Sequence, residues 1–212
     1  MFFLRTIFFF IIISQLTVGT TFFVRAAEIV AAKLSSDEKK ALTRIEAYLN
    51  DMKTLRAGFL QISSDNTVAT GNMFMSRPGK IRFEYDPPSP ILLVSDGVFL
   101  IYIDKELEQK THVWLSNTPI GFLTESNIKL DGDVTVTGFS MGPNVYSMTL
   151  VRTLDPQDGR ITMIFSDQPL ALRKWTITDS NGIKTTISLN NLERGITINP
   201  SVFEIKEFQF KD

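Results

Sequence analysis

The chain has 212 residues, 43% of them hydrophobic, with a formal net charge of −1 and no cysteine. This length and apolar content suit a single domain built around one substantial core. The near-neutral charge does not indicate a nucleic-acid partner, because phosphate binding requires a basic surface. The lack of cysteine excludes both a disulfide framework and acylation of an N-terminal cysteine.

The first 26 residues have the features of an export signal. Arg5 precedes the apolar run Ile7–Ile13, and the sequence ending at Ala26 fits a small-residue cleavage site, with Ala32 as a second candidate position. The alternative is a transmembrane anchor, but polar residues follow the apolar run and dilute it. The expected division is a cleaved signal peptide, residues 1–26, and one exported, soluble, periplasmic domain, residues 27–212.

A helix is predicted to begin after Ser35. Ser35 and Glu38 form a capping-box pattern, in which each side chain satisfies a free backbone N–H group of the other residue. Apolar residues then recur on one face of the helix: Leu42, Ile45, Leu49 and Met52. This pattern predicts a helix packed against a sheet.

The rest of the chain has the pattern of strands. From Leu55 onward, short β-branched and aromatic runs alternate with turn-forming residues. The turn signals are Ser64–Asn66, Pro78–Gly79, Pro87–Pro88, Asp96–Gly97, Asp155–Gly159 and Asn181–Gly182. This spacing predicts a mainly β protein with some helix (α+β), built on an antiparallel sheet or barrel of about eleven strands.

One predicted hairpin is apolar on both faces. Asp96-Gly97 is the clearest two-residue turn signal, and it joins Ile91–Ser95 to Val98–Ile103. Because both faces of these strands are apolar, another element must cover the second face. We expect the helix after Ser35 to do so.

A second hairpin is predicted around Arg77-Pro78-Gly79. Proline favours an extended residue before it, and glycine allows a sharp turn, so the arginine is expected near the hairpin tip. In the strand that follows, Ile81, Phe83 and Tyr85 share one face.

The segment from Ser116 to Leu123 breaks the strand pattern. Thr118 suits an N-cap and Pro119 suits the first helical position, so a short helix is predicted there. It would present Ile120, Phe122 and Leu123. Two roles fit, a plug over the open end of a barrel and a mobile lid.

The sequence offers little catalytic chemistry. The single histidine, His112, lies in a strand-like run, and there is neither a cysteine nucleophile nor a G-x-S-x-G elbow. Asp96, Asp104 and Glu106 lie in or beside turns, where surface charge is their expected role, although a carboxylate pair for glycoside chemistry stays an alternative. No metal site or cofactor is expected.

Several motifs together resemble a known family. They are Phe59 and Gln61 in an F-x-Q strand, Gly71 and Phe74, Ser76–Tyr85 (SRPGKIRFEY), Pro88, Val94–Gly97 (VSDG) and Asn117–Pro119 (NTP). In this order they resemble LolA, the periplasmic carrier of outer-membrane lipoproteins. Phe83 stands where that family commonly has tryptophan. The missing N-terminal cysteine argues against LolB, the lipoprotein receptor of the same fold.

The resemblance implies a half-open antiparallel barrel whose mouth is closed by helices around an apolar cavity for acyl chains. The implied cargo is acylated lipoproteins. The implied partners are an inner-membrane ABC release complex, LolCDE or its equivalent, and an outer-membrane acceptor that is LolB-like or the membrane itself. We expect a monomeric, non-enzymatic carrier. The alternatives are a periplasmic lipid-binding or sensing module of the same fold and a lidded hydrolase.

Two groups of site residues follow from this reading. The expected acyl-chain cavity is apolar, accessible, and lined by Met73, Met75, Phe83, Tyr85, Leu93, Leu100, Tyr102, Met148 and Met163. The expected lid and latch comprise Arg77, Pro119, Ile120, Phe122 and Leu123. Helix ends leave carbonyl groups unpaired, so we expect the Arg77 guanidinium to donate to the closed lid.

Overall fold

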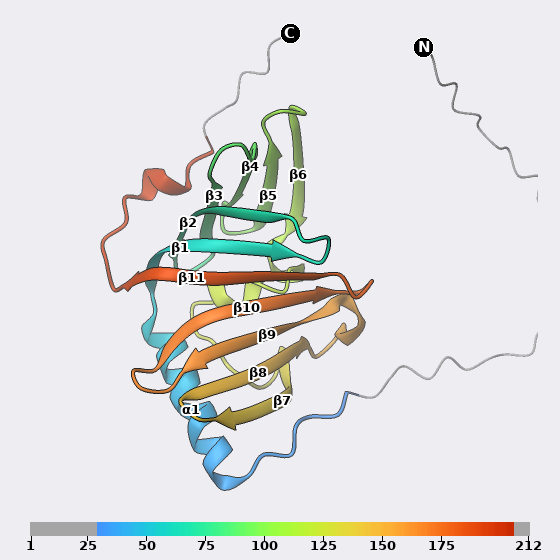
Figure 1. The fold of residues 1–212 in the computed structure, drawn as a ribbon, viewed down its shortest axis with the longest axis vertical. Helices are drawn as coiled ribbons and strands as arrows, with labels where there is room; N and C mark the ends of the chain where they lie inside the picture. Colours follow the sequence, from blue (N-terminus) through green and yellow to red (C-terminus); the bar gives the residue numbers. More distant parts are fainter. Residues whose placement is uncertain (1–28, 206–212) are drawn as a thin grey trace, which may run out of the picture.

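The computed structural model describes residues 29–205 (Figure 1). The expected signal peptide and its cleavage position at Ala26 lie outside the described residues. The helix is α1 (Ser36–Asp51). The strands are β1 (Thr54–Ser63), β2 (Val68–Ser76), β3 (Lys80–Tyr85), β4 (Ile91–Ser95), β5 (Phe99–Asp104), β6 (Gln109–Trp114), β7 (Val134–Gly142), β8 (Val145–Arg152), β9 (Gly159–Ser166), β10 (Ala171–Asp179) and β11 (Lys184–Arg194). Short 3-10 helices are η1 (Leu115–Asn117), η2 (Gly121–Thr124), η3 (Pro156–Asp158) and η4 (Pro200–Phe203).

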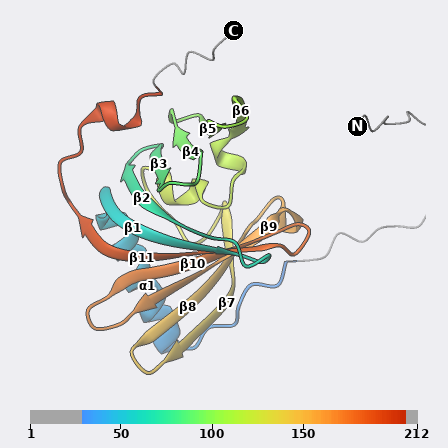
Figure 2. The same cartoon turned by 45° about the horizontal axis from the view of Figure 1, so that its top comes forward.

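All eleven strands form one antiparallel sheet in the order β6-β5-β4-β3-β2-β1-β11-β10-β9-β8-β7. Strands β1 to β6 and β7 to β11 are two meanders, and the pairing of β1 with β11 joins them, with Phe59 opposite Leu189. The sheet curls into an open half-barrel (Figure 2). The predicted α+β class, the half-open antiparallel barrel and the number of strands are therefore confirmed.

Helix α1 fills part of the concave side of the sheet (Figure 1). Its predicted capping box is present, because Ser35 N donates to Glu38 Oε2 (2.9 Å) and Glu38 N donates to Ser35 Oγ (3.3 Å). Its apolar face, including Ile45 and Leu49, belongs to the main buried cluster shared with the sheet. No helix within residues 29–205 is long and apolar enough to cross a membrane.

The convex side of β4 and β5 carries a second, smaller apolar cluster. Leu92, Val94, Ile101 and Ile103 are buried there, and Ile205 packs against them. The expectation that α1 would cover this face is wrong. The chain after β11 runs back along the outside of the sheet to β3 and supplies the cover instead (Figure 1).

Strands β2 to β5 align a row of side chains across the concave face. In the strand register, Met73 lies opposite Phe83, Phe83 opposite Leu93, and Leu93 opposite Tyr102. Facing residues of neighbouring antiparallel strands point to the same side of the sheet. The register of β2 to β5 therefore places four of the expected cavity residues in one row.

Candidate functional site

The lid segment forms two 3-10 turns in place of the single helix expected after Thr118. Thr118 follows η1, and its Oγ1 donates to Leu115 O (2.7 Å), so it caps the end of η1 and does not begin the next helix. A Cβ on Gly121 would lie 2.2 Å from Leu115 O, so glycine lets the chain fold back on itself here. Pro119 lies in the link before η2.

The tip of the β2–β3 hairpin holds the lid through two hydrogen bonds. Arg77 Nε donates to Leu123 O (2.7 Å), and Gly79 N donates to Thr124 O (2.9 Å). Gly79 has a φ of 73°, and a Cβ there would lie 2.8 Å from the Cα of Gly97. Glycine is therefore required at this turn on both counts.

The Arg77 guanidinium makes only part of its possible hydrogen bonds in this conformation. Its Nη1 and Nη2 atoms are buried and have no hydrogen-bond partner among the described residues. Burial lowers the pKa of Arg77 to about 10, so the side chain remains charged at neutral pH. One charge-assisted hydrogen bond to the lid is thus offset by the cost of burying the remaining donors.

The segment after the lid is fixed to α1 by side chains that the sequence reading did not single out. Asn50 donates through Nδ2 to Ile128 O and accepts from Ile128 N, both at 2.8 Å. Leu130 N donates to Glu46 Oε2 (2.9 Å), and Lys53 Nζ donates to a carbonyl at the other end of the segment. Glu46 and Asn50 are four residues apart on one face of α1, which is the signal that could have identified them, whereas Lys53 follows the helix.

The expected cavity residues lie together on the concave side, but most are closed off. Met73, Met75, Phe83, Met148 and Met163 are buried in one cluster with the lid residues Ile120 and Leu123. Tyr85, Leu93, Leu100 and Phe122 are partly buried against that cluster. The expectation of an accessible apolar face is therefore wrong for this conformation, because α1 and the lid fill the space above these side chains.

Tyr102 is the outlying member of the expected cavity set. Tyr102 is 39% exposed, and it lies on β5, next to the edge strand β6. It shares the concave face with Leu93, its cross-strand neighbour. The structure thus places Tyr102 at the rim of the half-barrel and not in its interior.

An aromatic cluster lies at the centre of the concave face. The Phe59 ring meets those of Phe83 and Tyr85 edge to face at 5.5 and 5.1 Å between centroids, and Phe83 meets Trp175 at 6.5 Å. Tyr85 donates its hydroxyl proton to Gln61 Oε1 (2.6 Å). Trp175 is fully buried, and its Nε1 has no hydrogen-bond partner among the described residues. The sequence reading used Phe59 only as a family motif and missed Trp175.

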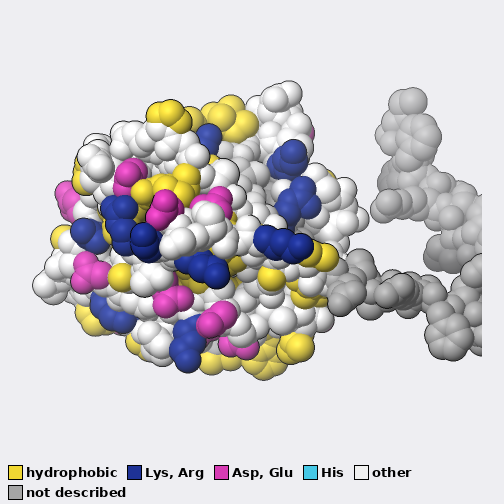
Figure 3. Space-filling model, turned by 90° about the horizontal axis from the view of Figure 1, so that it is seen from below, with side chains coloured by type: hydrophobic (Ala, Val, Ile, Leu, Met, Phe, Trp, Pro, Cys, Tyr) yellow, Lys and Arg dark blue, Asp and Glu magenta, His cyan; other side chains and the backbone are white. Residues whose placement is uncertain are grey.

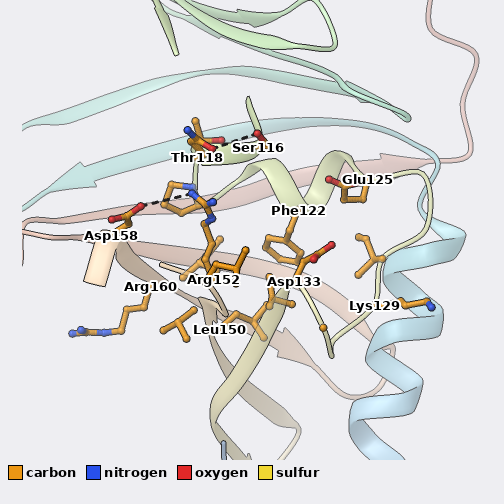
Figure 4. Close-up of a pocket in the computed structure, with 18 of the residues that line it drawn as sticks. Ser116, Thr118, Phe122, Glu125, Lys129, Asp133, Leu150, Arg152, Asp158 and Arg160 are labelled. Carbon is orange, nitrogen blue, oxygen red and sulfur yellow. Dashed lines mark hydrogen bonds and ion pairs between the residues drawn. The ribbon is translucent and has the colours of Figure 1, made fainter. Parts of the chain in front are cut away.

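An open pocket of about 370 Å³ lies beside the lid (Figure 4). One wall is the lid, including Pro119 and Phe122, and the opposite wall is formed by β8 and β9, including Leu150 and Ile161. None of the nine expected cavity residues lines it. Phe122 belongs to both places, because it lines the pocket and also packs against the buried cluster.

The two aspartates considered for catalysis accept hydrogen bonds from backbone N–H groups in turns. The Asp96 carboxylate accepts the N–H groups of Val98 and Phe99, and that of Asp104 accepts two N–H groups in the next turn. His112 lies on the edge strand β6, with its ring 6.1 Å from that of Phe99. On the face seen from below, cationic and anionic side chains are intermixed (Figure 3).

Comparison with known proteins supports what the fold suggests. Residues 50–206 match the family model described as outer membrane lipoprotein carrier protein LolA. The chain belongs to the LolA family. An outer-membrane lipoprotein carrier protein of Methylococcus capsulatus is 27% identical over 179 residues, which cover 80% of this chain and 85% of the relative. A relative with the same description from Chromobacterium violaceum is 27% identical over 186 residues, 84% of this chain and 89% of the relative.

A solved structure gives a weaker likeness. The LolA superfamily protein NE2245 from Nitrosomonas europaea aligns with a TM-score of 0.44 at 7% identity, covering 77% of this chain and 97% of that one. The family assignment rests on the sequence match over residues 50–206. That match includes the hairpin around Arg77 and the lid segment.

Proposed function

We propose that this LolA-family protein is a periplasmic chaperone that carries acylated lipoproteins from the inner to the outer membrane. The observation that carries the proposal is the lid, which lies over a buried cluster containing five methionines and is held to one hairpin by two hydrogen bonds. Family membership supports lipoprotein carriage as the general function. We propose no enzymatic activity.

Acyl chains need shielding during such a transfer. A chain of about sixteen carbons gains roughly 12 kcal/mol on leaving water, at about 0.8 kcal/mol per methylene. A lipoprotein with more than one chain therefore will not cross an aqueous compartment unaided. Release into water would cost as much, so the cargo must pass directly from one apolar site to the next.

The concave side supplies the residue types that this task requires. Met73, Met75, Met148 and Met163 have flexible thioether side chains, which adapt to chains of variable shape. Because the interior is filled in the present conformation, loading requires the lid or α1 to move away from the sheet. The chain would then occupy the space that Ile120 and Leu123 now fill.

Transfer requires partners at both membranes. We propose an inner-membrane ABC lipoprotein-releasing complex, LolCDE-like, as the donor. The acceptor would be a LolB-like receptor or the outer membrane itself. Arg77 would favour the empty, closed lid, because a contact made only in one state shifts the population toward that state.

The cargo of the protein as purified from its own periplasm tests this function. Mass spectrometry of that material should find acylated lipoproteins, and the Arg77→Leu variant should retain more of them than the parent. Free lipid in place of lipoprotein would contradict the proposal and favour a lipid-binding or sensing module of the same fold.

A further inference from the structure

We propose that the pocket beside the lid is a vestibule that binds a single acyl chain while the lid is still closed. The inference rests on the carrier function proposed above and concerns how its cargo enters. The vestibule is the space between Pro119 and Phe122 of the lid segment and Leu150 and Ile161 of the sheet (Figure 4). None of the nine residues expected to line the acyl-chain cavity lines this pocket.

The floor of the vestibule is apolar and continuous with the core. Val134, Leu150 and Ile161 line the pocket and are also buried members of the main cluster. Figure 4 shows the Phe122 ring pointing from the lid toward Leu150. Leu154 also lines the pocket and is 85% exposed. Because burying apolar surface is favourable, an apolar ligand that covers the Leu154 side chain would be stabilised.

The size of the vestibule fits one chain and not several. Its volume of about 370 Å³ lies at the low end of the range for ligand pockets, roughly 300–1,000 Å³. A multiply acylated cargo would therefore fill it with one chain. The remaining chains must wait until the interior opens.

The rim favours a head group without net charge. Arg152 lies 3.0 Å from Asp155 and 3.7 Å from Asp158, so its charge is already compensated. The pocket is also lined by acidic and basic side chains together: Glu125, Lys129, Asp131, Asp133 and Arg160. Because a free carboxylate would meet acids as well as bases, an ester- or amide-linked chain with a neutral or zwitterionic head fits better than a free fatty acid.

Binding in the vestibule breaks none of the bonds that hold the lid. Neither Arg77 nor Gly79 nor Thr124 lines the pocket. A chain lying on Leu150 and Ile161 would have to displace Phe122, which packs against the buried cluster, to reach the interior. Phe122 therefore acts as the gate between an open outer site and a closed inner one.

Titration with lysophosphatidylcholine, a single-chain zwitterionic lipid used below its micelle concentration, tests the vestibule. Leu154→Asp should weaken the binding of this lipid by about tenfold. The variant loses one apolar contact and places a charge beside the acyl chain, and both changes lower the affinity. Leu107→Asp is the matched control, because Leu107 is 63% exposed in the turn after β5 and lies outside the pocket. It should leave the affinity unchanged.

Hydrogen exchange at the Gly79 amide, which donates to Thr124 O (2.9 Å), reports whether the lid stays closed. This amide should remain protected when the vestibule is full. Loss of its protection, equal weakening by both aspartate variants, or no binding to the parent would overturn the vestibule.

A triacylated lipopeptide separates the vestibule from the carrier function. If it enters the interior of the parent while lysophosphatidylcholine binding is insensitive to Leu154→Asp, the vestibule is refuted and the carrier function stands. If the single-chain lipid binds as expected and the lipopeptide never enters, the carrier function is refuted and the vestibule is retained as a lipid site.

Discussion

Arg77 shows how one side chain can hold a lid without holding it too firmly. It gives the lid a charged hydrogen bond of 2.7 Å to Leu123 O, yet two of its nitrogens are buried without partners among the described residues. A charge-assisted hydrogen bond contributes roughly 1.5–3 kcal/mol, and unsatisfied buried donors offset part of this. Under the proposed carrier function, this balance would let the latch open when a lipoprotein arrives.

Arg77→Leu should leave the protein folded and able to load lipoprotein but should slow delivery to the acceptor. The leucine fills the space without donating to Leu123 O, so the closed, empty state loses its advantage over the loaded state. A transfer assay between purified donor and acceptor membranes measures the rate. Arg56→Leu, at an exposed position of β1, is the control. Unloading as fast as in the parent would refute the latch.

Tyr85 gives a pH-dependent prediction. Burial, and secondarily the nearby charge of Tyr102, raises the pKa of Tyr85 to about 12. Because the folded pKa exceeds the unfolded value of about 10, the neutral phenol stabilises the fold below pH 10, and this stability is lost as the pH rises toward 12. The loss should reach about 2 kcal/mol.

Urea unfolding at several pH values checks this dependence. Tyr85→Phe removes the titrating group and also its hydrogen bond to Gln61, so the variant should be less stable than the parent at pH 8 but should lose less stability by pH 11. Tyr102→Phe, at the exposed rim, removes only the secondary contribution of the Tyr102 charge, so this variant should keep most of the pH dependence of the parent. Parallel curves for Tyr85→Phe and the parent would contradict the assignment.

At the scale of elements, the lid is held from two sides. The hairpin tip binds its end at Leu123 and Thr124, and α1 binds the following segment through Glu46 and Asn50. The first contact involves a turn and the second a helix. Motion of the lid relative to the hairpin therefore need not disturb its attachment to α1.

Asn50→Ala should destabilise this attachment. Both hydrogen bonds to Ile128 are lost and its backbone groups are left without these partners, so unfolding should become easier by about 1–3 kcal/mol. Thermal unfolding measures the change, and amide exchange at Ile128 should rise with it. Asn181→Ala, in the exposed turn after β10, is the control. An Ile128 amide as protected as in the parent would show that α1 does not hold the segment.

Some elements follow from local sequence and others do not. The capping box at Ser35 and the turn around Asp96-Gly97 depend on residues within four positions of one another. The capping box forms as predicted. The turn forms one residue later than predicted, because Asp96 pairs with Phe99 and β5 begins at Phe99. The lid depends on the close approach of Gly121 to Leu115, which outweighs the preference of Thr118 for an N-cap. The cover over β4 and β5 comes from Ile205, about a hundred residues away, and no local pattern indicates it.

At the scale of the molecule, the sequence predicts which residues face inward but not whether they enclose a space. Strand period and register bring Met73, Phe83, Met148 and Met163 to one face, as the expected cavity set requires. Whether that face encloses an open cavity depends on how closely α1 and the lid pack against the sheet. This depends on contacts between distant segments, such as those of Ile120 and Leu123 with the core.

The central claim is that acyl chains enter the concave interior, and Trp175 reports on that place. The chain has two tryptophans, of which Trp114 is 55% exposed on β6 and Trp175 is fully buried beside Phe83. In the Trp114→Phe variant, Trp175 is the sole tryptophan and its fluorescence is quenched only by a bromine atom that reaches the interior.

The decisive measurement is the fluorescence of Trp114→Phe loaded with a triacylated lipopeptide whose chains carry bromine, compared with the same lipopeptide without bromine. Our account predicts strong quenching by the brominated lipopeptide alone, with saturation at one lipopeptide per protein. Stable binding of the brominated lipopeptide with the fluorescence of Trp175 unchanged would contradict it, because the chains would then lie outside the half-barrel.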